Sequence, residues 1–289
     1  MRTRAADGGP RPARDRARTW VSAGYSRRGL SPVVDARPPF RALSLDLWFT
    51  LLYYAPERDD QWREDRARLL RDTLRTRDGQ RIDLVAVKGA IDTVHSRLRA
   101  ERREPITLDP EELIPLYIEA LDAELAFPLA GFAREFSAVG LEEHPPVANP
   151  EAAPLVQSLA ERKIPVIAIT NTARRGSTWR DYLRDAVGLE LRLVFSSCDC
   201  GAAKPDPSIF LKAARRIGLA PQEILHVGDS WELDVEGALR AGFGAMLYRG
   251  LWKYYPEGDW SVTASQLPTR HDVRSVDRLD EVLAVQFLT

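Results

Sequence analysis

The sequence predicts an α/β fold in which a parallel sheet is interrupted by a helical insertion. From about residue 150 onward, apolar helical and extended segments alternate along the chain. This alternation is typical of right-handed βαβ units that build a parallel sheet. Residues 58–145 instead show helical periodicity without a convincing strand. An apolar run at residues 43–52 precedes that block and is typical of a buried parallel strand.

The apolar segments of the alternating region define its elements. We expect strands at 164–169, 193–196, 224–227 and 245–248, and helices at 154–162, 209–217 and 235–241. In the helical block, one helix is expected from near Asp59, and a second carries an apolar stripe formed by Leu84, Val87, Ile91, Val94 and Leu98. A third helix is expected at Asp109, where an N-cap, a first-turn proline and a capping-box Glu112 coincide.

The composition argues against several classes of function. With 44% hydrophobic residues over 289 positions, the chain can bury a substantial core and is not disordered as a whole. The net charge of −1 provides no basic field for nucleic acid. No apolar run approaches the ~18 residues that indicate a membrane span. Cys198 and Cys200 are too close in sequence for a disulfide framework, so we expect a reducing, cytoplasmic location.

Residues 1–38 differ from the rest of the chain. They are rich in Arg, Ala, Gly and Pro and show no periodic apolar spacing, so we interpret them as a flexible N-terminal extension. Two alternatives stay open. One is a transit peptide, which is typically rich in Arg and poor in acids. The other is a chain start assigned too far upstream.

Carboxylates accompany two of the predicted strands. Asp46 lies in the run at 43–52, and Asp229 follows the strand at 224–227 within a Gly-Asp-Ser turn. Asp234 comes five residues after Asp229, where it can begin the following helix. Taken alone, Asp46 is equally consistent with a loop residue that caps the next segment. Because a parallel sheet brings its strand ends to one edge, we expect the three acids to meet there.

Groups that can hold an anion accompany the other strands. Thr170 and Asn171 end the strand at 164–169 and offer a hydroxyl and an amide for an anionic oxygen. Lys204 comes just before Asp206 and Pro207, an N-cap and first-turn pair that fixes a helix start. The sequence therefore predicts a lysine held beside the acids.

The combination predicts phosphoryl-transfer chemistry. Three clustered carboxylates repel one another unless a cation neutralises them. Mg²⁺ is typically held by one or two carboxylates together with water and substrate phosphate. Phosphoryl transfer depends mainly on positioning and charge neutralisation. In this arrangement Asp46 is expected to act as a covalent nucleophile.

These segments resemble the four motifs of the haloacid dehalogenase-like (HAD) hydrolase superfamily. The resemblance rests on four patterns in the right order, Asp46-x-x-x-Thr50, Thr170-Asn171, Lys204-Pro-Asp-Pro and Gly228-Asp229-Ser230-x-x-x-Asp234, and covers about 40–250. It implies a Rossmann-like, doubly wound parallel sheet core formed by residues 39–57 and 146–289. It also implies that residues 58–145 are a helical cap domain inserted after the first motif.

The resemblance also implies roles for individual residues. Asp46 is expected to be the nucleophile, Thr170 to hydrogen-bond the transferring phosphoryl group and Lys204 to neutralise it. Asn171 joins Thr170 as a candidate for substrate binding. The implied Mg²⁺ ligands are Asp46, the backbone carbonyl of Trp48, Asp229 and, in a supporting position, Asp234.

Trp48 departs from the pattern of the family's phosphatases. These usually carry a second Asp at this position, which acts as the general acid and base, whereas an indole offers only an N–H donor. Dehalogenases of the family also lack that Asp, but they need no metal, while the motif of Asp229 and Asp234 is the metal-binding form. We give the metal motif more weight because it rests on more residues.

We therefore expect a capped hydrolase that uses Mg²⁺ on a small phosphorylated metabolite, with no nucleic-acid or membrane partner and no predicted oligomeric state. Two alternatives are a metal-independent haloacid dehalogenase and a binding protein of this fold in which Trp48 prevents turnover. His226 is interpreted as a structural residue. A substrate role for Arg174, Arg175 and Trp179 is left open.

Overall fold

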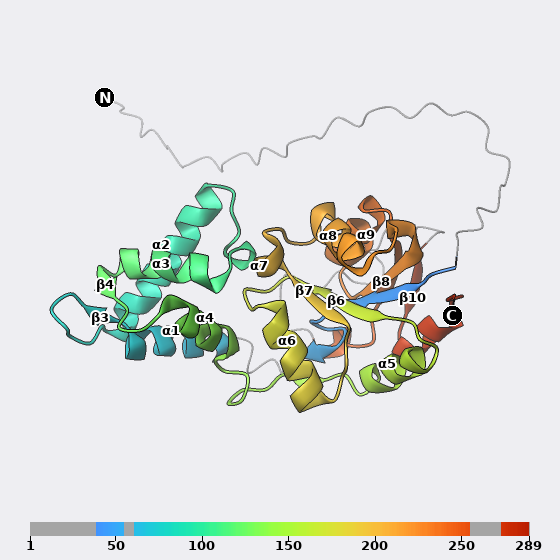
Figure 1. Ribbon diagram of the computed structural model, residues 1–289, viewed down its shortest axis with the longest axis horizontal. Helices are drawn as coiled ribbons and strands as arrows, with labels where there is room; N and C mark the ends of the chain where they lie inside the picture. Colours follow the sequence, from blue (N-terminus) through green and yellow to red (C-terminus); the bar gives the residue numbers. More distant parts are fainter. Residues whose placement is uncertain (1–38, 55–60, 255–272, 289) are drawn as a thin grey trace, which may run out of the picture. The chain divides into compact units, whose positions relative to one another are not determined.

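A computed structural model describes residues 39–54, 61–254 and 273–288 (Figure 1). The predicted extension at 1–38 and the predicted start of the helical block near residue 58 lie outside the described residues.

The core of the fold is a parallel sheet of six strands in the order β10-β9-β8-β1-β6-β7 (Figure 1). Its strands are β1 (Ala42–Leu45), β6 (Val166–Thr170), β7 (Leu193–Ser196), β8 (Ile224–Gly228), β9 (Gly244–Tyr248) and β10 (Arg274–Val276). β1 lies between β6 and β8, with Leu45 opposite Ala168 on one side and Val227 on the other. The predicted α/β class and parallel sheet are confirmed.

The direction in which strands are added to the sheet reverses beside β1, which creates a topological switch point there. From β1 the chain adds β6 and β7 on one side, then returns to place β8 against the other side of β1. In open α/β sheets, ligands bind outside the carboxyl ends of the strands at such a point. Asp46 follows β1 and Asp229 follows β8, so the topology brings these two acids to the switch point.

Helices cover both faces of the sheet, which identifies it as doubly wound. They are α5 (Ala152–Glu161), α6 (Gly176–Tyr182), α7 (Ser197–Cys200), α8 (Pro207–Ile217) and α9 (Gly237–Arg240). Along β1, Leu43 packs with α5 and α6 in one hydrophobic cluster, whereas its neighbour Ala42 packs with α8 and α9 in another. This alternation follows from the two-residue period of a strand. A last 3₁₀ helix, Leu279–Ala284, packs in the cluster of α5.

The helical block forms its own hydrophobic core. Its helices are α1 (Gln61–Thr73), α2 (Leu84–Ala100), α3 (Pro110–Ala120) and α4 (Leu129–Ala138), with a 3₁₀ turn at Pro105–Thr107. Val87, Val94 and Leu98 of the predicted stripe are buried in that core, while Leu84 and Ile91 are partly buried against it. The predicted capping box at the start of α3 is present, because Asp109 accepts from Glu111 N and its own N–H donates to Glu112.

The prediction that the helical block holds no strand is wrong in one detail. β3 (Arg75–Thr76) pairs with β4 (Ala123–Glu124) in an antiparallel ladder. A similar short pair, β2 (Leu52–Tyr53) and β5 (Val147–Ala148), lies at the two ends of the insertion. Ladders of two residues are too short to leave a periodic pattern in the sequence.

A second correction concerns Asp234. It lies inside the π-helical turn Trp231–Glu236, whereas the sequence led us to expect it at the start of the next helix. Ser230 is the N-cap instead, because its Oγ accepts from Leu233 N at 3.2 Å. Serine is as good an N-cap residue as aspartate, so the sequence alone did not separate the two.

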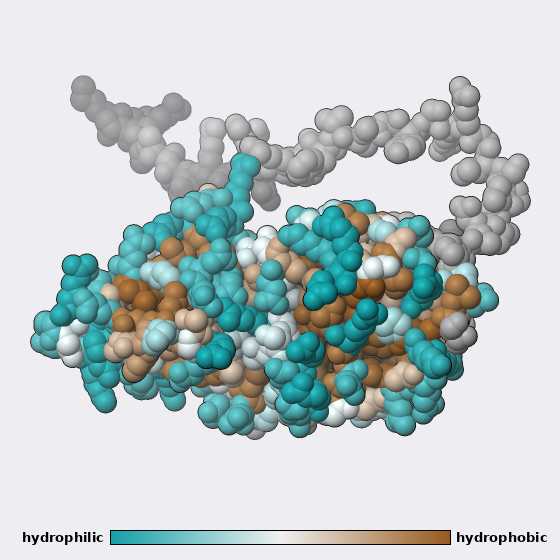
Figure 2. Space-filling model, in the orientation of Figure 1, coloured by the Kyte–Doolittle hydropathy of each residue, from teal (hydrophilic) through white to brown (hydrophobic). Residues whose placement is uncertain are grey.

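Figure 2 shows hydrophilic side chains interspersed with hydrophobic ones over both the helical block and the α/β core. Within the described ranges, no helix is both long enough and apolar enough to cross a membrane. Cys198 and Cys200 are free thiols, Cys198 being buried.

Candidate active site at the carboxyl edge of the sheet

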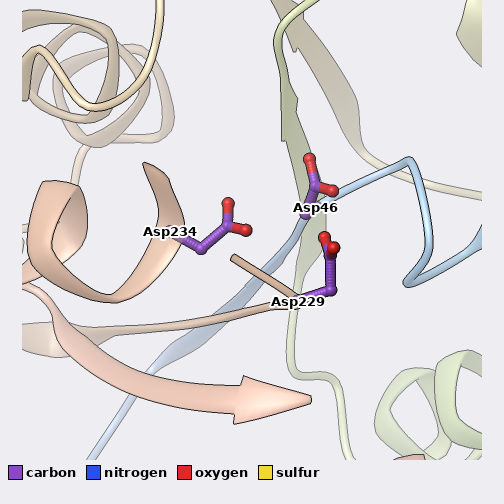
Figure 3. Close-up of side chains that lie close together, drawn as sticks. All are labelled: Asp46, Asp229 and Asp234. Carbon is purple, nitrogen blue, oxygen red and sulfur yellow. The ribbon is translucent and has the colours of Figure 1, made fainter. Parts of the chain in front are cut away.

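Three carboxylates converge at the switch point (Figure 3). One oxygen from each of Asp46, Asp229 and Asp234 lies within 4.8 Å of the others, and all three residues are buried. Asp46 continues from β1 and donates its N–H to Val227 O at 2.9 Å, which ties it to β8. The predicted meeting of these acids therefore occurs in the structure.

Lys204 bridges two of the acids. Its Nζ donates to Asp46 Oδ1 and to Asp234 Oδ1, each at 2.5 Å, and the lysine is 4% exposed. Asp206 is the N-cap of α8, as predicted, and accepts from Ser208 N at 2.8 Å. The start of α8 thus holds Lys204 beside the nucleophile candidate.

Asn171 fixes the backbone of Lys204. Its Nδ2 donates to Lys204 O at 2.9 Å, and its Oδ1 accepts from Lys204 N at 2.7 Å. The side chain therefore positions the lysine, and its predicted contact with substrate stays a prediction. Thr170, at the end of β6, has a buried Oγ1 with no hydrogen-bond partner within the described part of the chain. An unpaired buried hydroxyl calls for a partner, and this one is available to an anionic oxygen.

A buried histidine contacts Asp234. His226 Nε2 lies 3.1 Å from Asp234 Oδ1, and His226 Nδ1 lies 2.9 Å from Ser44 Oγ. Because an ionised carboxylate only accepts, Nε2 carries the proton and Nδ1 accepts from the hydroxyl. Asp234 Oδ2 accepts from Ser230 N at 2.9 Å. A Cβ at Gly228 would lie 2.2 Å from Asp234 Cγ, so glycine is required for this packing.

The pKa values of the three acids are shifted in two different directions. Burial raises the pKa of Asp46 to about 6, although Lys204 opposes the rise. Burial and then the charge of Asp46 hold the pKa of Asp229 well above its usual range. Burial also acts to raise the pKa of Asp234, but Lys204 and His226 overcome it and hold that pKa below its usual range. Asp234 therefore stays ionised and paired with Lys204. The negative charges of Asp46 and Asp229 are not fully neutralised by the lysine.

This donor set fits a divalent cation. Three buried acids face one lysine, so the fully ionised cluster carries a net charge of about −2. Oxygen ligands of this kind suit Mg²⁺. Both oxygens of Asp234 already accept hydrogen bonds, which leaves Asp46 and Asp229 with the freer carboxylates.

Trp48 lies in an aromatic wall next to the nucleophile candidate. Its ring stacks on Tyr54 with centroids 5.0 Å apart and meets Trp179 edge-on at 5.3 Å. Trp179 is fully buried, and its indole N–H donates to Thr172 Oγ1 at 3.3 Å. The indole of Trp48 cannot shuttle protons, as expected from the sequence, whereas the neighbouring Tyr54 carries a phenolic O–H.

Two residues around the site, Ser44 and Arg66, were not predicted from the sequence. Ser44 was read as part of an apolar strand, although a hydroxyl inside such a run is itself a signal. Arg66 lies four residues from both Trp62 and Leu70 on α1, which places a cation on the apolar face of that helix. This position was the signal that could have identified it.

The chain also matches known proteins. A family model described as haloacid dehalogenase-like hydrolase matches residues 40–242. A glyceraldehyde 3-phosphate phosphatase of Methanopyrus kandleri is 34% identical over 93 residues, which are 32% of this chain and 40% of that protein. A phosphoserine phosphatase of Thermus thermophilus is 44% identical over 66 residues, 22% of this chain and 26% of that protein. The chain thus spans less than half the length of these curated relatives.

Two solved structures share the fold at low sequence identity. A HAD phosphatase from Thermococcus onnurineus has a TM-score of 0.51 at 20% identity and covers 86% of this chain and 100% of its own. A 2-haloacid dehalogenase from Pseudomonas syringae pv. Tomato DC3000 has a TM-score of 0.50 at 22% identity and covers 85% of this chain and 98% of its own.

Proposed function

The chain belongs to the haloacid dehalogenase-like hydrolase family, and we propose that it is a Mg²⁺-dependent phosphatase with Asp46 as its nucleophile. One observation carries the proposal: Asp46 and Asp229 lie together at the switch point, buried and short of positive charge, with Lys204 held against Asp46. The similarity to a glyceraldehyde 3-phosphate phosphatase and to a phosphoserine phosphatase supports a small phosphorylated substrate.

The residues present divide the work of phosphoryl transfer among them. Asp46 would attack phosphorus as the leaving oxygen departs and form an aspartyl phosphate, which water then hydrolyses to phosphate and free Asp46. Lys204 neutralises charge on the phosphoryl oxygens, and the unpaired Thr170 hydroxyl donates to one of them. Asn171 acts through Lys204 by fixing its backbone. Phosphoryl transfer needs this kind of positioning more than covalent assistance.

Asp46, Asp229 and the backbone carbonyl of Trp48 would hold the Mg²⁺, with Asp234 in support through Lys204. When bound, the ion supplies charge neutralisation to the phosphoryl oxygens. The leaving oxygen needs a proton, and the side chain of Trp48 cannot supply it. Turnover is therefore expected to favour leaving groups that are stable as anions. Loss of a general acid typically costs about 10²- to 10⁴-fold in rate.

A second candidate is a carbon–halogen hydrolase. It is favoured by Trp48, whose packing against Tyr54 and Trp179 makes an apolar wall where phosphatases of the family carry an acid. In this reaction Asp46 attacks carbon, halide leaves, and no metal is required. Halide release that persists in EDTA would support this candidate over the phosphatase.

The proposal is tested with 4-nitrophenyl phosphate and Mg²⁺. We expect hydrolysis that is lost with EDTA and lost in Asp46→Asn, which keeps the size of the side chain. Asp181→Asn, at an exposed ion pair on α6, is the matched control and should leave the rate unchanged. Activity that survives both EDTA and Asp46→Asn contradicts the mechanism, and Mg²⁺ binding without any turnover would indicate a binding protein.

A further inference from the structure

Two buried arginines near the site form no ion pair in the described part of the chain, although the charge of Asp65 acts on Arg174. Arg66 of α1 is 7% exposed and Arg174 is 4% exposed. Arg66 Nη2 donates to Ala173 O at 3.2 Å, while Arg174 donates to Ser137 O at 2.6 Å and to Val139 O at 2.8 Å. All of these acceptors are neutral backbone carbonyls.

Burying two like charges costs free energy, which the rings of Trp62 and Phe136, with centroids 5.3 and 4.9 Å from the Arg66 guanidinium carbon, offset only in part. Burial, followed by the charge of Arg174, lowers the pKa of Arg66 to about 9. Burial likewise lowers the pKa of Arg174. Arg66 Nε is buried and finds no hydrogen-bond partner within the described residues. A backbone carbonyl needs a donor but no net charge, so these hydrogen bonds do not account for the choice of two guanidinium groups.

The aromatic wall connects the two arginines to the nucleophile candidate. Trp48, two residues after Asp46, stacks on Tyr54 at 5.0 Å. Burial raises the pKa of Tyr54, and the charges of Arg174 and Arg66 oppose that rise.

A second set of contacts leads to the same place. The Arg174 guanidinium carbon lies 5.8 Å from the ring centroid of Trp179, whose ring in turn meets Trp48 at 5.3 Å. Arg66 is tied to Ala173, three residues after Thr170 at the end of β6. The cationic pair therefore lies where residues just after β6 contact α1 of the helical block.

We propose that Arg66 and Arg174 bind a second anionic group of the substrate, a carboxylate or a further phosphate carried by the leaving group. The inference rests on the proposed function and narrows its substrate class to phosphate esters with two anionic ends. Oxyanions with two or more acceptor oxygens match the planar fork of guanidinium donors, and such charge-assisted pairs are the strong ones.

The test compares substrates that differ only in the second charge. One arm pairs ω-phosphonooxy carboxylates with their carboxamides, with one to four methylene groups between the two ends. The other arm pairs diol bisphosphates with the corresponding diol monophosphates over the same lengths. We expect kcat/KM, measured with Mg²⁺, to be at least about tenfold higher for the doubly anionic member at one length in one arm, and that arm identifies the anion.

Variants assign the preference to the pair. Arg66→Gln should bring the ratio of kcat/KM values toward one, and Arg66→Lys should keep part of it, because the charge remains but the fork is lost. Arg68→Gln, at an exposed residue of α1 paired with Glu64, is the matched control and should keep the full ratio. If folded Arg66→Gln and Arg66→Lys both keep the full ratio of kcat/KM values between the doubly and singly anionic substrates, the proposal is overturned.

Two further outcomes separate this inference from the proposed function. If the wild type hydrolyses both members of every pair equally, the anion site is refuted and the phosphatase stands. If the wild type hydrolyses none of them, calorimetric titration of Asp46→Asn with the same esters and Mg²⁺ decides the inference by itself. Tighter binding of the doubly anionic esters would support it, and equal or absent binding would overturn it.

Discussion

Lys204 and Asp234 form a buried ion pair, with Nζ 2.5 Å from Oδ1, and the same Nζ donates to Asp46. Of the two acids, Asp234 is the one whose pKa lies below its usual range, after Lys204 and His226 overcome the effect of burial. The lysine is thus anchored by Asp234 and presented to Asp46, which keeps an unsatisfied charge for ligands.

Removing Lys204 is expected to damage both stability and turnover. Lys204→Met leaves Asp46 and Asp234 buried without their shared donor, and breaking a buried pair typically costs about 3–5 kcal/mol in the free energy of unfolding. Urea unfolding with EDTA measures the loss, and we expect Mg²⁺ to restore part of it. Lys163→Met is the control at an exposed position, and an equal loss there would contradict this view of the pair.

His226 is expected to act as a positioning residue. His226→Leu removes the donor to Asp234, which frees Asp234 to draw Lys204 away from Asp46. We expect kcat to fall by about tenfold, the size of one lost hydrogen bond to a charged group, with KM little changed. His226→Gln keeps a donor of similar reach and should recover most of kcat. A loss confined to KM would contradict the role.

The stability of the metal-free protein should fall as pH rises from about 4 to about 6. Burial raises the folded pKa of Asp46 to about 6 from an ordinary value of 3.8, so the folded state holds the proton more tightly than the unfolded state. Its contribution is fully present below the ordinary value and is lost as pH rises through the folded one. Asp229, whose pKa is also raised by burial, acts in the same direction.

Urea unfolding in EDTA across this pH range measures the effect. Asp46→Asn should flatten the curve, while Asp181→Asn should not. Mg²⁺ should counter the loss increasingly toward higher pH, because the ionised carboxylates bind it. A metal-free stability that rises through the same window would contradict the proposed charge state of Asp46.

Trp48→Asp should raise phosphatase activity at a cost in stability. A carboxyl at this position restores an acid beside the leaving oxygen, and general acid–base catalysis contributes about 10²-fold or more. Loss of the ring contacts with Tyr54 and Trp179 should cost about 2 kcal/mol, given roughly 1 kcal/mol for each aromatic pair. Trp48→Ala separates the two effects, since it loses the packing without gaining the acid. No gain in kcat would mean that Trp48 does not limit turnover.

The sequence was sufficient where function follows a local pattern. Asp46 and Asp229 each follow an apolar strand and Thr170 ends one, and parallel strands bring their ends together, so their common edge was predictable. Asp206 and Pro207 marked the start of α8, which placed Lys204 in the same region.

The finer geometry was not predictable because it joins residues that are far apart in the chain. The Asn171 clamp spans 33 positions and the contact of Ser44 with His226 spans 182, and neither leaves a periodic or motif-like trace. Arg66 carried a weak signal, as a cation on an apolar stripe, but its contact with Ala173 depends on tertiary structure. The N-cap role of Ser230 was hidden because Asp234 is an equally good capping residue by type.

Trapping the covalent intermediate tests the central claim most directly. Protein incubated with Mg²⁺ and an excess of phosphorylated substrate is quenched in acid, reduced with borohydride and mapped by peptide mass spectrometry. If Asp46 is the nucleophile, its aspartyl phosphate is reduced and residue 46 is found as homoserine, only when both substrate and Mg²⁺ are present. Product formation with an unmodified Asp46, or with the modification at another carboxylate, would contradict the account.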